Sequence, residues 1–173
     1  MVNTKLITLL KTLSKSEINK FRDFVSSPFY NKNQTVINLC EEVIKYHPGY
    51  DPEQCKEEYI FNKMFGKEKY NYFKLKNIIS DLYQLSVSFL KLIAIEKRGI
   101  KNEIDLLNEL HERKLDSLYV QKEKQINKSL ENIKVRDEFY YQKLYQIARV
   151  NTSHYKFIKS GYTFNLIQNE FDI

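Results

Sequence analysis

The longest uninterrupted apolar pattern in the chain lies between residues 71 and 98. Apolar residues recur there at alternating spacings of three and four, the a/d seam of a helix that packs along one stripe: Leu75, Ile78, Leu82, Leu85, Phe89 and Leu92. At about 1.5 Å per residue, this helix is roughly 40 Å long. We therefore expect one long helix that begins after the N-cap Asn71 and forms the centre of the packing.

Four shorter amphipathic segments precede the long helix. Their apolar positions recur at helical spacing and predict helices over residues 2–12, 14–27, 34–46 and 52–65. Ser14 and Glu17 have the spacing of a capping box, and Asn33 and Asp51 are N-cap candidates for the third and fourth helices. Gly66 stands where a helix can end in a left-handed residue.

Amphipathic helices also follow the break at Gly99. The pattern predicts a helix from Asn102 to His111 or beyond, further helical positions up to Ile133, and a helix over 138–159 capped by Asp137. We expect one inward face on this last helix and an interruption at residues 160–161; the expected inward residues are Tyr141, Leu144, Ile147, Ala148, Tyr155 and Ile158. Because few residues separate the last two helices, they should form an antiparallel hairpin.

These patterns predict an all-α protein with two regions. Residues 1–99 form a compact helical module around the long helix, and residues 100–173 form a solenoid-like region of antiparallel helix pairs, which can be the start of a longer helical array. Only 4 Gly and 3 Pro occur among the 173 residues. A β-sandwich or an α/β fold normally needs more turn residues, so the composition supports long helices.

The chain has the features of a soluble protein from a reducing compartment. Its 42% hydrophobic and 29% charged residues are ordinary for a globular domain. No signal peptide is visible, and no run approaches the roughly 20 apolar residues that span a bilayer. Cys40 and Cys55 have no metal-ligand spacing, and we expect them to be free thiols in a cytoplasmic protein with no membrane partner.

The net charge of +6 comes entirely from residues 61–101, which carry nine basic and three acidic side chains. Much of the excess lies in one basic run, which consists of Lys63, Lys67, Lys69, Lys74 and Lys76. A local basic patch can bind phosphate or an acidic partner. The alternative is a solvated helix start without a binding role.

The sequence contains no recognisable catalytic or metal-binding constellation. His47, His111 and His154 lie far apart, and none has a carboxylate or thiol at ligand spacing. The four scattered glycines form no phosphate-binding loop, and the adjacent pairs of glutamates diverge by about 100° on a helix. We therefore predict a protein that is not an enzyme and has no cofactor, no catalytic residues and no metal site.

The remaining candidate surface is the apolar C-terminal segment, where a helical pattern ends without an evident partner. Its candidate residues are Phe164, Leu166, Ile167 and Phe171. We predict a protein–protein interaction or scaffold module that binds a protein partner or associates with itself. The alternative is weak, non-specific nucleic-acid binding through the basic run. Arginine is absent from that run, and base readout usually depends on arginine.

Two strings, LSKSEINKFRDFVSSPFYNKN and YIFNKMFGKEKYNYFKLKNIISDLYQLSVSFL, carry a family resemblance. Together they resemble the opening of a family of uncharacterised, mainly helical bacterial proteins with a Ser-Pro-aromatic-aromatic-Asn motif, which is Ser27–Asn31 in this chain. The resemblance implies more helix pairs than this chain holds, so that the chain is a fragment or a shortened member, and it implies no activity. We expect Pro28 to end a helix, Phe29 and Tyr30 to fill a groove, and Asn31 to satisfy turn amides.

Overall fold

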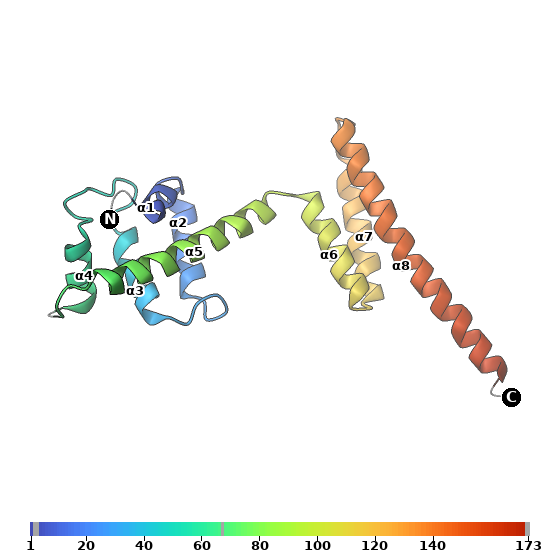
Figure 1. Cartoon of the computed structure of the whole chain (residues 1–173). Helices are drawn as coiled ribbons and strands as arrows, with labels where there is room; N and C mark the ends of the chain where they lie inside the picture. The colour runs from blue at the N-terminus through green and yellow to red at the C-terminus, as the bar shows by residue number, and fades with distance from the viewer. Residues whose placement is uncertain (2–3, 67, 172–173) are drawn as a thin grey trace. The chain divides into compact units, whose positions relative to one another are not determined.

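The computed structural model describes residues 1, 4–66 and 68–171, with side chains except those of residues 157 and 160–171. In this part of the chain all regular structure is helical and no strand occurs, so the predicted all-α class is confirmed (Figure 1). The helices are α1 (Lys5–Leu10), α2 (Lys15–Ser26), α3 (Gln34–Ile44), α4 (Glu57–Phe65), α5 (Tyr72–Glu96), α6 (Ile100–Glu112), α7 (Asp116–Glu131) and α8 (Glu138–Phe171). They belong to two compact units, Met1–Ala94 and Ile95–Ile173.

Local capping signals start several helices where the sequence predicts them. The Ser14 hydroxyl accepts from the Glu17 amide at 3.2 Å, while the Glu17 carboxylate accepts from the Ser14 amide at 2.8 Å, which completes the capping box of α2. Asn33 and Asn71 each accept a backbone amide at 3.0 Å at the starts of α3 and α5. These side chains satisfy amides that have no partner within the helix.

Several predicted helix boundaries are wrong, among them the end of α3, which lies at Ile44 and not at residue 46. α1 is shorter than residues 2–12, and α4 begins at Glu57, not at Pro52. Asp51 caps only a turn, through a 2.8 Å bond from the Glu53 amide. Tyr50 before it and Cys55 after it are both buried, and this tertiary packing overrides the local helix signal. α8 continues through residues 160–161, where a glycine costs only about 1 kcal/mol and removes no backbone hydrogen bond.

The predicted turn motif after α2 is partly wrong. The Asn31 side-chain amide donates to the Val25 carbonyl at 3.0 Å, and its oxygen accepts from the Asn33 amide at 3.0 Å, as its predicted turn role requires. Tyr30 packs on Phe24 with ring centroids 4.2 Å apart. Phe29, however, is 87% exposed and fills no groove, because Tyr30 already covers the nearby ring.

The core of the N-terminal unit is built on one stripe of α5. Leu75, Leu82 and Phe89 are almost completely buried against α1–α4, and Leu85 and Leu92 are partly buried. The Phe89 ring lies 5.4 Å from that of Phe21 and 5.6 Å from that of Phe24 (both centroid distances), which joins α5 to α2. Figure 1 shows α5 crossing α2 and α3 within this unit. The predicted seam is therefore filled by the chain's own helices.

The same helix is long and apolar enough to span a membrane by length and composition alone. Within Tyr72–Glu96, an 18-residue window reaches a mean hydropathy of 1.5. By this measure the expectation that no run is apolar enough to span a bilayer is wrong. Core helices of soluble proteins pass the same test, and the seam of α5 packs on the other helices of its unit, although only 22% of the window is buried.

The C-terminal unit has a smaller core of its own, formed by facing stripes of α6, α7 and α8. Its buried residues are Ile104, Leu107, Tyr119, Ile126, Leu130, Ile147 and Val150. Asp137 caps α8 by accepting the Tyr140 amide at 3.0 Å, as predicted. Side-chain bonds between α7 and α8 pair Tyr119 with Asn151 and Glu123 with Tyr155. This packing positions the outer surface of α8.

Replacing Leu82 by aspartate should unfold the N-terminal unit. Leu82 is 0% exposed, so an unpaired carboxylate there should cost more than about 4 kcal/mol of a total stability of roughly 5–15 kcal/mol. Urea unfolding followed by circular dichroism measures the loss. The matched variant Gln84→Asp, on an exposed face of the same helix, should change the unfolding free energy by less than about 0.5 kcal/mol. Equal stability of the two variants would contradict the assigned core.

Candidate functional site

The basic run is divided among local partners. The Lys74 ammonium lies 2.8 and 2.9 Å from the two oxygens of the Glu68 carboxylate and 3.8 Å from the centroid of the Phe65 ring. These contacts compensate its charge and hold it against the end of α4. The helix dipole disfavours a cation near the N-terminal end of a helix, and the carboxylate of Glu68 in the preceding turn offsets this effect for Lys74.

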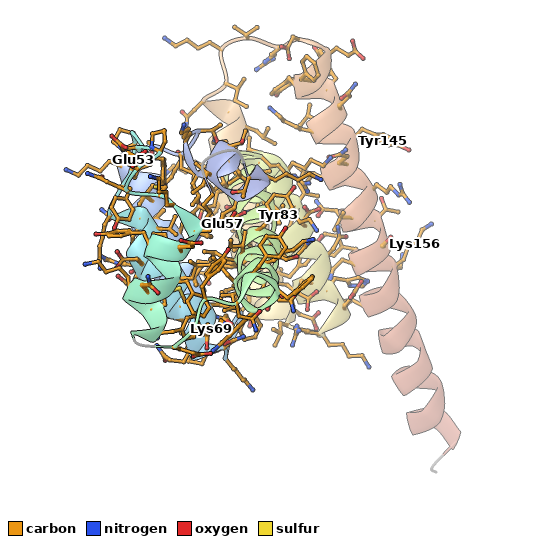
Figure 2. The ribbon with its side chains drawn as sticks, turned by 60° about the vertical axis from the view of Figure 1, so that its left-hand side comes forward. Glu53, Glu57, Lys69, Tyr83, Tyr145 and Lys156 are labelled. Carbon is orange, nitrogen blue, oxygen red and sulfur yellow. The ribbon has the colours of Figure 1, made fainter. Side chains whose placement is uncertain are left out.

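The other described lysines of the run face solvent. Lys63 lies over the Tyr59 ring at 5.4 Å and Lys76 over the Tyr72 ring at 5.6 Å, measured from nitrogen to centroid. Lys69, labelled in Figure 2, is exposed close to the start of α5. Lys67 lies outside the described residues. The basic run therefore consists of two lysines that each lie over an aromatic ring, Lys63 and Lys76, and of Lys74, whose charge is compensated by Glu68.

The second predicted surface lies outside the described side chains. The backbone of α8 is helical through Phe171. The side chains of the four candidate residues are not among those that the structure describes: Phe164, Leu166, Ile167 and Phe171. Their proposed role in binding stays a prediction from the sequence.

The described part of α8 carries two apolar stripes where the sequence predicts one. Ile147, Val150 and His154 are buried against α6 and α7. A second stripe, which we call the aromatic stripe, is exposed and consists of Tyr141, Leu144, Tyr145, Ala148, Thr152 and Tyr155. The prediction that Tyr141, Leu144, Ala148 and Tyr155 face inward is wrong, because at 100° per residue they lie to one side of the buried seam.

Three aromatic rings along this stripe are exposed to solvent. Tyr141 is 59% exposed, Tyr145 69% and Tyr155 45%, and Leu144 lies between them at 36%. The Thr152 hydroxyl donates to the Ala148 carbonyl at 2.8 Å, so its polar group is already satisfied within α8. Figure 2 shows Tyr145 and Lys156 pointing away from α6 and α7. A spacing of four, three, four and three along residues 141, 145, 148, 152 and 155 is the sequence signal that identifies the stripe.

A hydrogen-bond network fixes one edge of the aromatic stripe to α7. The Tyr119 hydroxyl donates to the Asn151 carbonyl oxygen at 2.6 Å, and the Asn151 amide donates to Glu123. The Tyr155 hydroxyl donates to the other Glu123 oxygen at 2.6 Å. This bond to a carboxylate, together with burial, raises the pKa of Tyr155 to about 12. The network holds Tyr155 in place while leaving one side of its ring exposed.

Two histidines that are distant in sequence meet beside this network. The Nδ1 atoms of His111 on α6 and His154 on α8 lie 3.1 Å apart. The buried His154 ring stacks on Tyr119 at 3.5 Å, and its Nε2 lies 3.8 Å from the Asp116 carboxylate. A hydrogen bond between these two atoms requires that one Nδ1 carries a proton and the other does not. If both rings were protonated, two N–H groups would point at each other. No local spacing in the sequence indicates this pair.

Metal-ligating and nucleophilic side chains are the groups that could carry chemistry among the described residues. They contain no group of three or more His, Cys, Asp and Glu side chains placed to hold a metal ion. Burial raises the pKa of the Cys40 thiol to about 12, which disfavours the nucleophilic thiolate. A groove of about 400 Å³ between α6 and α8 has charges of both signs, from Lys101, Asp105 and Arg149. Whether the protein is an enzyme stays a matter of prediction.

Comparison with known proteins adds no relative: no family model, curated protein or solved structure matches the chain. The family resemblance of the N-terminal strings therefore stays a prediction. The aromatic stripe of α8 and the partly paired basic run are the surfaces on which function can be argued.

Acidification should destabilise the C-terminal unit through His154. Burial lowers the pKa of His154 from 6.5. The Asp116 carboxylate opposes this shift, the charge of His111 adds to it to a smaller extent, and Glu123 opposes it least. The unfolded chain therefore takes up the proton first. Stability is complete above pH 6.5 and falls as the pH drops from there to the lower folded pKa, by about 1.4 kcal/mol or less for each pH step of one.

Hydrogen exchange of α7 and α8 amides between pH 8 and 5, corrected for intrinsic rates, measures this effect. The variant His154→Phe should flatten the pH dependence of amide protection in the C-terminal unit, whereas His47→Gln in the other unit should leave it unchanged. An unchanged slope in His154→Phe would assign the effect to other groups.

Proposed function

We propose that this chain is a non-enzymatic protein–protein interaction or scaffold module. The observation that carries the proposal is the aromatic stripe on the outer side of α8, where three tyrosines are between 45% and 69% exposed along one line. Scattered surface hydrophobics are ordinary, but a continuous exposed apolar stripe is typical of a surface that another helix covers.

The chemistry of the stripe suits a protein partner. Tyrosine supplies a large contact area with only two side-chain torsions to fix, and its hydroxyl can stay in water at the rim. Interface hot spots are accordingly enriched in tyrosine. The stripe rests on a rigid support, because Tyr155 and the neighbouring Asn151 are bonded to Glu123 of α7. A partner therefore meets a surface that is already ordered.

The solenoid-like region expected from the sequence stays part of this proposal, and the two faces of α8, which packs chiefly on α6, support it. In helical arrays, each helix pair buries one face on the preceding pair and offers the opposite face to the next. The buried seam of α8 contacts its own unit, and the aromatic stripe corresponds to the offered face. We propose that a helix of a protein partner occupies the position that the next helix of an array would take.

Replacing two stripe tyrosines should abolish partner capture. The full chain serves as bait in a lysate of its source organism, with quantitative mass spectrometry of the captured proteins. The variant Tyr141→Ser/Tyr145→Ser should lose specific partners by at least about tenfold, since interface tyrosines are often worth about 2 kcal/mol or more. The matched variant Gln142→Ser/Gln146→Ser alters exposed positions on the same helical turns and should retain them. Equal capture by both variants would contradict the proposal.

Nucleic-acid binding through the basic run is the second candidate. The observation that favours it is the pairing of Lys63 with Tyr59 and of Lys76 with Tyr72, whose rings are 43% and 47% exposed. Exposed rings beside lysines can stack on bases of a single strand while the ammonium groups meet phosphates. Because Lys74 is paired with Glu68, fewer cations are left for phosphates than the sequence suggests.

Fluorescence anisotropy with a labelled single-stranded oligonucleotide at low salt tests this second candidate. We expect weak binding that disappears near 0.2 M salt, as electrostatic contacts to phosphates require. The variant Lys63→Glu/Lys69→Glu/Lys76→Glu should abolish it. The variant Lys5→Glu/Lys11→Glu/Lys32→Glu changes the net charge equally at exposed sites elsewhere and should keep it. Loss of binding in both variants would show that net charge alone is responsible.

A further inference from the structure

The aromatic stripe has the spacing of a second helix-to-helix seam. Tyr141, Tyr145, Ala148, Thr152 and Tyr155 follow one another at intervals of four, three, four and three residues, with Leu144 beside them. The seam runs for about 21 Å along the helix axis. Its centre lies roughly 120° around α8 from the buried seam. A second helix can therefore lie on the stripe without displacing α6 or α7.

The stripe is self-complementary when its direction is reversed. Ala148 is its smallest residue and lies midway between Tyr141 and Tyr155. An antiparallel copy centred on Ala148 places Tyr141 opposite Tyr155 of the second copy and Leu144 opposite Thr152. Tyr145 comes opposite Asn151, which lies beside the stripe. The small residue at the centre allows the two helices to approach closely. Such a contact is isologous, with the same residues contributed by both copies around a two-fold axis.

The charges along the edge of the stripe also favour the antiparallel direction. Glu138 at the start of α8 and Lys156 near the end of the stripe lie five helical turns apart on the same edge. Reversal brings the acidic start of one helix near the basic end of the other and opposes the helix dipoles. A parallel two-fold pair would instead place the two copies of this edge on opposite sides of the seam, so that Glu138 would not approach Lys156 of the other copy.

Two shallow hollows beside the stripe match this arrangement. One, of about 380 Å³, is lined by residues that include Glu138, Tyr141 and Tyr145. The other, of about 360 Å³, is lined by Tyr155 and Lys156 among others. The first hollow also has a polar side, formed by Gln142, Gln146 and Arg149, which points away from the stripe. In an antiparallel pair its tyrosine side faces the second hollow of the other copy, so that Tyr141 and Glu138 lie near Tyr155 and Lys156 of that copy.

Arg149 opposes the arrangement, because it lies one residue from the two-fold axis and would approach its copy. Measured around the helix from the buried seam, Arg149 lies beyond the tyrosines, at the edge between the stripe and the polar face. Its long side chain can keep the guanidinium in water. The repulsion is between solvated charges and is screened by salt. It weakens the pair without reversing the preference for the antiparallel direction.

From these observations we propose that the aromatic stripe is a homodimer surface, on which α8 of a second copy lies antiparallel with the two-fold axis at Ala148. This inference rests on the proposed function, since it names the partner of the same stripe. One helix pair of this length forms a small interface, so the dimer is weak, with a dissociation constant in the micromolar range or above.

Thiol cross-linking of the full chain tests the geometry. Ala148→Cys should be joined to itself by a short bis-maleimide, while Gln146→Cys, on the polar face of the same turn, should give at least about tenfold less product. Tyr141→Cys mixed with Tyr155→Cys should give a mixed product, but Tyr141→Cys alone should not, because its two copies lie about 21 Å apart in the antiparallel pair. The native Cys40 and Cys55 are 1% and 0% exposed and should not react.

The outcomes separate the inference from the proposed function. Self-cross-linking of Tyr141→Cys would overturn the antiparallel direction. Light scattering should show the mass rising toward twice the monomer mass with concentration, and Tyr145→Glu should remain monomeric. A wild-type monomer at all concentrations, or no Ala148→Cys product above the Gln146→Cys control, overturns the homodimer. In that case loss of a captured protein by Tyr141→Ser/Tyr145→Ser would still support the proposed function with a different partner.

Discussion

Burial of the α5 stripe is the interaction on which the N-terminal unit depends. α1 and α4 have only 6 and 9 residues, and helices this short are marginal without tertiary packing. They are stable because Leu75, Leu82 and Phe89 give them a common apolar surface to cover. The contact of Phe89 with Phe21 and Phe24 transmits this support to α2. The caps then determine where each helix starts, while the stripe determines that the helices exist together.

The C-terminal unit is organised by polar contacts to a greater extent. Its core is smaller, and a network of Tyr119, Asn151, Glu123 and Tyr155 joins α7 to α8. His154 is enclosed beside this network against Tyr119 and His111. Buried polar groups specify one alignment of helices, because a shifted alignment would leave their donors and acceptors without partners. Such specificity matters for α8, because the alignment of its buried seam on α6 and α7 determines which residues of α8 face outward as the aromatic stripe.

The sequence predicted the features that local physics determines. Ser14, Asn33, Asn71 and Asp137 act on amides within three residues, so their capping roles were predicted correctly. Where distant packing decides, the prediction was wrong, as at Asp51, which starts a turn and not α4.

The candidate site was predicted less well than the fold. Apolar residues on two sides of α8 were assigned to one face, since periodicity alone does not tell which side of a helix is covered by its own chain. The His111–His154 contact joins positions on α6 and α8 that no short motif relates. The charge of Lys74 was counted toward a binding patch, although its compensation by Glu68 depends on the turn between α4 and α5.

Tyr155 belongs to both the internal network and the exposed stripe, which gives it a double role. Its hydroxyl is bonded to Glu123 inside the unit, while its ring is 45% exposed at the surface. A partner that binds this ring in its bonded orientation also stabilises the bond between α7 and α8. By thermodynamic linkage the converse holds, so whatever loosens the α7–α8 pairing weakens binding to the stripe by the same free energy. Assembly on the outer surface and the internal stability of the hairpin are thus coupled through one side chain.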